Sequence, residues 1–121
     1  MPDTQTEQES ILRSIKKLLG VGDDYDAFDT DIVIAINSAL STLHQLGVGP
    51  ETAFTVSNNS TTWSDFLGTA TNLDAARSYV YITARLLFDP PQNAFLVRSL
   101  EALREEYTFR LLVAAEDNQN G

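Results

Sequence analysis

Apolar residues recur at intervals of three and four in four separate segments of the chain, and this spacing predicts four helices. The first segment ends at Leu19 and is preceded by Thr6 and Glu9, which can form a capping box at the helix start. Each of the other three segments carries an apolar stripe, as expected for a helix that packs one face against a core. The predicted helices span residues 6–19, 30–46, 72–88 and 93–115.

Glycine and proline residues mark where these helices end. Gly20 follows the first helix and Gly47 the second, and glycine readily adopts the left-handed conformation that closes a helix. Val48 is placed to make the apolar contact of a Schellman closure. Residues 89–91, Asp-Pro-Pro, end the third helix because proline cannot continue the helical hydrogen bonding. The polar residues 116–121 are predicted to form a flexible tail.

The segment between the second and third helices has a different pattern. Residues 54–56 read as a short strand, residues 57–60 favour a turn, and residues 61–63 could return as the partner strand. Residues 64–68 look like a single helical turn or a loop. An isolated hairpin is only marginally stable, so this one must lean on the helices or on a neighbouring chain.

These elements together predict one fold class. Short connections favour antiparallel helices, and 121 residues suit one domain, here 1–121. We therefore expect a mainly α protein: a four-helix, mostly antiparallel bundle with a small β-hairpin-like excursion between helices 2 and 3.

The charge balance changes the range of expected functions. The formal net charge is −9, with 17 acidic against 8 basic residues, and the only basic run is Lys16-Lys17. Tight, direct DNA binding is therefore not expected, because it needs Lys or Arg to displace counterions from phosphates. Repulsion from DNA would suit a channel through which DNA slides. The start of the chain lacks a signal-like pattern and no apolar run could span a bilayer, so we expect a soluble protein without membrane contact.

The residue types needed for catalysis or metal binding do not form a recognisable motif. His44 is the only histidine and no nucleophile elbow accompanies it, so a structural role is expected. The acidic cluster of residues 23–31, aligned as a calcium loop from Asp24, has Asp29 where glycine is required and Ala35 where glutamate is required. The chain has no cysteine. We predict no catalytic residues, no cofactor, no metal and no enzymatic activity.

Two groups of apolar residues exceed what a plain bundle requires. Trp63, Phe66 and Leu67 lie in a segment with little local structure to bury them, so they either anchor another protein or fold back on the core. The end of the fourth helix is apolar nearly all round, so it is either wrapped by the bundle or, as we prefer, meets another subunit. The candidate interface residues are Phe54, Trp63, Phe66, Leu67, Tyr107, Phe109, Leu112 and Val113.

Several short segments also follow one another in a familiar order between Ser10 and Leu112. They are residues 15–20 (IKKLLG), the Asp-rich connector with Tyr25, residues 28–32 (FDTDI), 36–37 (IN), 46–50 (LGVGP), 63–68 (WSDFLG), 79–82 (YVYI) and 85–91 (RLLFDPP). In this order and spacing the chain resembles the head-tail connector (portal adaptor) family of tailed bacteriophages.

This resemblance implies a structural subunit without enzymatic residues. It implies a homo-oligomeric ring, twelvefold on the portal, that docks on the portal protein and offers a platform to a stopper or tail-completion protein. DNA would pass through the ring without tight binding. The expected location is the head-tail interface of the virion, and the host cytoplasm during assembly. Ring closure requires two different patches on each subunit, and the Trp63 segment and the fourth helix are the candidates.

The alternative is a small helical DNA-packaging or regulatory protein, such as a terminase small subunit or a helix-turn-helix regulator. Such a protein should carry a basic recognition helix, and no predicted helix here has one.

Overall fold

Five helices account for most of the part of the chain that the structure describes, and the protein is mainly α, as predicted. The computed structural model describes residues 9–68 and 73–120, with side chains through Glu116. No strand occurs within those residues, where the β-type pairing is an isolated antiparallel bridge between Ser10 and Thr62. The helices are α2 (Ile11–Leu19), α3 (Asp29–Gln45), α4 (Trp63–Leu67), α5 (Leu73–Phe88) and α6 (Ala94–Asn120).

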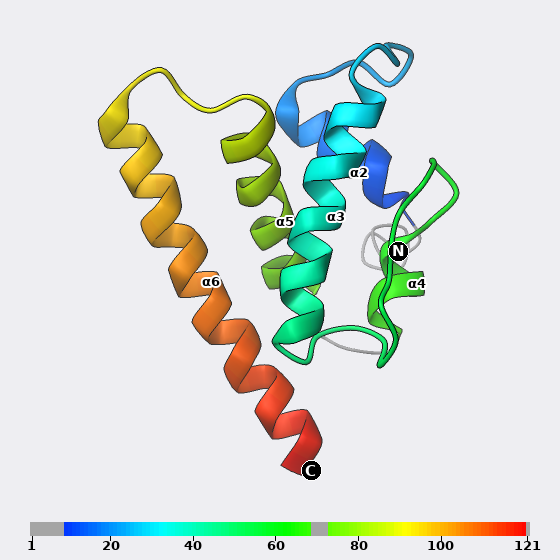
Figure 1. Cartoon of the computed structure of the whole chain (residues 1–121), viewed down its shortest axis with the longest axis vertical. Coiled ribbons are helices and arrows are strands. Elements are labelled where there is room, and N and C mark those ends of the chain that lie inside the picture. The colour runs from blue at the N-terminus through cyan, green and yellow to red at the C-terminus, as the bar shows by residue number, and fades with distance from the viewer. Residues whose placement is uncertain (1–8, 69–72, 121) are drawn as a thin grey trace.

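Helix α5 is the centre of the arrangement (Figure 1). It packs against α3 on one side and against α6 on the other, and α2 packs against both α3 and α5. The chain runs down α3, up α5 and down α6, so these neighbours are antiparallel. The connection between α5 and α6, residues 89–93, is short, as expected for antiparallel neighbours. The predicted four-helix bundle is not confirmed, since the described residues form five helices and α6 packs mainly against α5.

The core lies mainly between α2, α3 and α5, and buried side chains of α4 and α6 complete it. Ala76, Val80 and Ala84 recur every fourth residue on α5 and are buried, and their small size lets the neighbouring helices approach closely. Each large apolar side chain removed from water contributes roughly 1.5–3 kcal/mol to folding. The large buried aliphatic residues of α2 and α3 are Ile11, Leu12, Ile15, Ile32, Ile36, Leu40 and Leu43.

The helix ends follow the local signals in the sequence, with two differences. Gly47 N–H donates to the His44 carbonyl and Val48 N–H to the Leu43 carbonyl, which is the predicted Schellman closure. At the other end of the chain, α6 extends through residues 116–120, which were predicted as a tail; no glycine or proline interrupts the helix there.

The start of the first helix also differs from the prediction. The predicted cap, Thr6, lies outside the described residues. Helix α2 begins at Ile11, and the Ser10 hydroxyl caps it by accepting a hydrogen bond from Arg13 N–H at 3.2 Å.

The predicted hairpin is not found, because residues 54–56 bind a helix instead of residues 61–63. The Asn37 side chain of α3 donates to the Val56 carbonyl at 2.9 Å and accepts from the Val56 N–H at 2.7 Å. This amide therefore takes both backbone groups that a partner strand would have used. Thr62 pairs with Ser10 instead, and Ile11 N–H donates to the Thr61 carbonyl at 2.9 Å. The segment is held against α2 and α3 by single polar contacts and not by a ladder.

We expect Asn37→Ala to lower the free energy of unfolding by about 1–3 kcal/mol, because two hydrogen bonds are lost and the partly buried Val56 backbone is left unsatisfied. Ser38→Ala, at an exposed position on the same helix, is the matched control and should change stability by no more than about 0.5 kcal/mol. Urea denaturation followed by circular dichroism measures both. Equal stabilities of the two variants would contradict this role of Asn37.

Gly49 occupies a position that only glycine can fill without strain. Its φ of +91° is unfavourable for residues with a side chain, and an added Cβ would lie 2.5 Å from Phe66 Cε1. We expect Gly49→Ala to destabilise the protein by about 2 kcal/mol or more, since left-handed strain and the clash add. Gly22→Ala is the control, because a Cβ there meets nothing within 4 Å. Thermal unfolding of both variants tests this, and an unchanged midpoint for Gly49→Ala would contradict it.

Candidate protein-interaction surfaces

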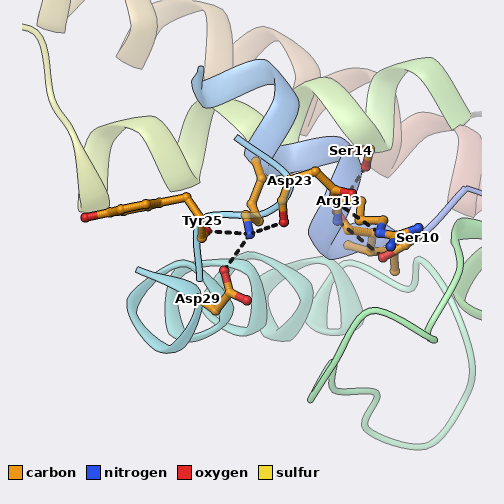
Figure 2. Close-up of polar contacts among 8 residues, drawn as sticks. Ser10, Arg13, Ser14, Asp23, Tyr25 and Asp29 are labelled. Atoms are coloured by element: carbon orange, nitrogen blue, oxygen red, sulfur yellow. Dashed lines mark hydrogen bonds and ion pairs between the residues drawn. The ribbon is translucent and has the colours of Figure 1, made fainter. Parts of the chain in front are cut away.

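The acidic connector between α2 and α3 is organised by one buried cation, Lys16. Its side chain is 2% exposed, and its ammonium donates to the Tyr25 carbonyl at 2.8 Å and to the Asp23 carbonyl at 3.3 Å. The same nitrogen lies 2.8 Å from Asp29 Oδ1. Figure 2 shows Asp23, Tyr25 and Asp29 gathered around these contacts, with the Tyr25 ring pointing away. Three oxygens thus satisfy a charge whose burial alone would be costly.

The other acidic residues of the connector are used differently. Asp23 forms an ion pair with Arg13 at 3.2 Å, on the exposed side of α2. Asp29 and Asp31 lie in the first turn of α3, where carboxylates favour the positive end of the helix dipole. Within residues 9–68 and 73–120, no group of three or more His, Asp or Glu residues is placed to hold a metal ion. His44 is half-buried on α3.

The folded connector presents aromatic rings beside the end of α5. The Phe28 ring lies 5.4 Å from the Tyr25 ring and 5.3 Å from the Phe88 ring, centroid to centroid, the second pair edge to face. Next to them is a hollow of about 400 Å³. Ile34 on α3 and Leu87 on α5 border it and are 63% and 59% exposed. We call this surface the aromatic hollow; its lining residues are Phe28, Asp31, Ile34, Ala35, Leu87 and Phe88.

A second apolar surface follows the length of α6. The face that meets α5 carries Leu111 and Ala115, both buried. On the opposite face Phe95, Ala102 and Phe109 recur every seven residues, which keeps them in line along a helix. Phe95 and Phe109 are 68% and 67% exposed. We call this line the α6 stripe; it consists of Phe95, Ala102, Phe109 and Val113.

The interface residues predicted from sequence divide into two groups. Trp63 and Phe66 are buried in the core, where the Trp63 indole donates to Ser14 Oγ at 2.8 Å, so these side chains fold back as the second of the two expectations had it. Phe54 and Leu67 are half-buried beside them, with the Phe54 ring 5.2 Å from that of Phe66.

The predicted residues of α6 lie closer to the surface. Tyr107 is half-buried and packs against the core, with the Arg110 guanidinium 5.4 Å from its ring centroid. Phe109, Leu112 and Val113 are exposed. The structure therefore places Phe109 and Val113 on one exposed surface, whereas Trp63 and Phe66 are buried and are not exposed for contact with another protein.

The aromatic hollow was missed by the sequence reasoning. The stronger of two signals in the sequence was Ile34, which falls off the main apolar stripe of α3. The rings of Tyr25 and Phe28 in an otherwise acidic connector were a second, weaker signal.

A comparison with known protein families matches this chain to one of them. The sequence model of that family, described as phage connector protein, matches residues 11–118. The chain belongs to the phage connector protein family. The match begins at the first residue of α2 and ends within α6, so it includes all five helices. Searches of curated proteins and of solved structures find no match.

Most basic side chains of this phage connector protein are paired with carboxylates. Five of its eight basic residues form ion pairs with carboxylates. Lys17, Arg98 and Arg104 form none within the described part of the chain. In that same part, no helix combines the length and the hydropathy needed to cross a membrane. The exposed surface therefore combines excess negative charge with two apolar areas.

We expect Lys16→Met to lower the free energy of unfolding by about 2–4 kcal/mol, because Asp29 and two carbonyls lose the cation that binds them. Methionine keeps an apolar chain of similar length, so the loss reports on the ammonium. Lys17→Met, at the neighbouring exposed position, should change stability by no more than about 0.5 kcal/mol. Chemical denaturation of both variants is the measurement, and similar losses in the two would argue against a special role of Lys16.

Proposed function

We propose that this phage connector protein is a head-tail connector subunit of a tailed-phage virion. Copies of the chain form a ring that docks on the portal and links it to stopper or tail proteins, and DNA passes through the ring. The observation that carries the proposal is the family match, which extends over residues 11–118. A family that connects phage parts is defined by contacts between proteins, and this chain has apolar surface to make them.

The distribution of apolar surface supports a ring. A closed ring needs two different patches on each subunit, because each copy contacts one neighbour with one patch and the other neighbour with the second. The aromatic hollow lies between the start of α3 and the end of α5, and the α6 stripe faces away from α5. Helices α3 and α6 lie on opposite sides of α5 (Figure 1), so the two surfaces are on different flanks.

The charge of the chain supports a passage for DNA. A net charge of −9 repels the phosphate backbone, and five of the eight basic residues are held in ion pairs with carboxylates. Lys and Arg must be available in numbers to bind DNA tightly. DNA can therefore slide past such a protein without being retained.

Negative-stain electron microscopy of the purified protein, alone and mixed with portal rings of the same phage, tests the proposal. We expect annular particles or portal rings that carry an added layer of density. A filter-binding assay with duplex DNA across a salt series is the companion measurement, and we expect no retention at moderate salt. A protein that stays monomeric, ignores portal rings and retains DNA would contradict the proposal and favour a DNA-packaging or regulatory function.

A further inference from the structure

The two apolar surfaces are complementary in shape and in charge. The aromatic hollow is concave and includes one carboxylate, Asp31. The α6 stripe is the convex face of a helix, and Arg98 lies one turn after Phe95 beside it. Neither Asp31 nor Arg98 forms an ion pair within residues 9–68 and 73–116. Phe95 and Arg98, one turn apart on α6, are thus complementary to the apolar lining and the Asp31 carboxylate of the hollow.

We infer that the occupant of the aromatic hollow is the start of α6 from a second copy of this chain. The Phe95 ring of one copy enters the hollow beside Phe28 and Ile34 of its neighbour, and Arg98 of the first copy faces Asp31 of the second. The inference rests on the proposed function and deepens it, because it names which two surfaces meet between subunits of the ring.

The start of α6 is fixed in the conformation that this contact needs. The Asn93 side chain accepts hydrogen bonds from the N–H groups of Phe95 at 2.8 Å and of Leu96 at 3.3 Å, which caps the helix. Helix α6 follows the rigid Pro90-Pro91 link. The Phe95 side chain is therefore presented from an ordered turn, so that binding costs less conformational entropy than it would from a loose segment.

The hollow is likewise prepared before a neighbour arrives. Phe28 is held against Phe88, and the Lys16 contacts hold the connector that carries Phe28. A volume of about 400 Å³ is at the small end of pockets that bind a ligand. A single aromatic side chain with its neighbours on one helix turn suits a space of this size. Charge then selects the partner, because a hollow with one carboxylate favours an apolar group that brings a cation.

The ion pair can be tested by reversing its charges in the full-length protein. Asp31→Arg and Arg98→Asp should each raise the concentration needed for half-maximal assembly about tenfold or more, because each sets like charges against one another across the contact. The double variant should assemble within about threefold of the parent protein, since it restores an opposite pair. An equimolar mixture of the two single variants should also assemble, as alternating copies form only opposite pairs. Lys17→Asp is the matched control, because Lys17 is exposed and lies on α2.

Sedimentation velocity without portal, and counting of bound copies on portal rings, provide the two readouts. Circular dichroism checks that each variant is folded. If the parent protein assembles in either readout and the single variants assemble as well as Lys17→Asp, the inference is overturned while the proposed function stands. If the parent protein assembles in neither, the proposed function fails and the inference with it. Loss of assembly in the single variants without recovery in the double variant also overturns the pairing of Asp31 with Arg98.

Disulfide trapping gives an independent test, because the chain has no cysteine of its own. Ile34→Cys and Phe95→Cys placed together in one chain should give a ladder of covalent multimers on mild oxidation, as each copy is linked to two neighbours. Each single cysteine variant should give no ladder. Dimers from Phe95→Cys alone would mean that α6 stripes pack against one another, and would overturn the inference. A double variant that assembles yet forms no covalent multimers would do the same.

Discussion

One buried ammonium group, that of Lys16, organises the acidic connector between α2 and α3. Five aspartates lie between residues 23 and 31, and their mutual repulsion would otherwise extend the connector into solvent. Lys16 binds one of these carboxylates and two backbone carbonyls of the same segment, which folds the connector back on α2. Phe28 then lies beside Phe88, with Tyr25 against Phe28, and the aromatic hollow forms next to them. The candidate contact surface thus depends on a lysine that is itself almost fully buried.

The sequence predicted those features whose causes are local. Helical spacing, and the glycines that follow α2 and α3, act within one or two turns. Both ends of α3 and α5 and the end of α2 lie within about a residue of the expected positions, whereas the start of α2 and the end of α6 do not. The hairpin failed for the opposite reason. Asn37 and Val56 are 19 positions apart, and Ser14 and Trp63, which form a buried hydrogen bond, are 49 positions apart. Turn chemistry and strand propensity contain no information about such partners.

The two candidate surfaces differ in how far they could be predicted. The α6 stripe lies on one helix, and the excess of apolar residues near Phe109 indicated its second half, whereas Phe95 and Ala102 were not singled out. The aromatic hollow combines residues from the connector, from α3 and from α5. Its shape follows from the tertiary packing of Phe28 on Phe88, which no pattern within one segment expresses. Within single segments, the sequence shows only that Ile34 lies off the main apolar stripe of its helix and that Tyr25 and Phe28 are aromatic residues in an acidic connector.

Assembly of this chain has to overcome its own charge. Copies that each carry a net charge of −9 repel one another, and at physiological salt this repulsion acts over roughly 8 Å. Burial of apolar surface is not opposed in this way, because it depends on area removed from water and not on sign. In the proposed ring, apolar contact supplies the attraction and the opposite pair of Arg98 and Asp31 sets the register. In that proposed arrangement, the acidic residues outside the contact face the DNA. On this reading the excess of carboxylates and the excess of exposed apolar side chains answer one requirement, a protein that adheres to its neighbours and not to nucleic acid.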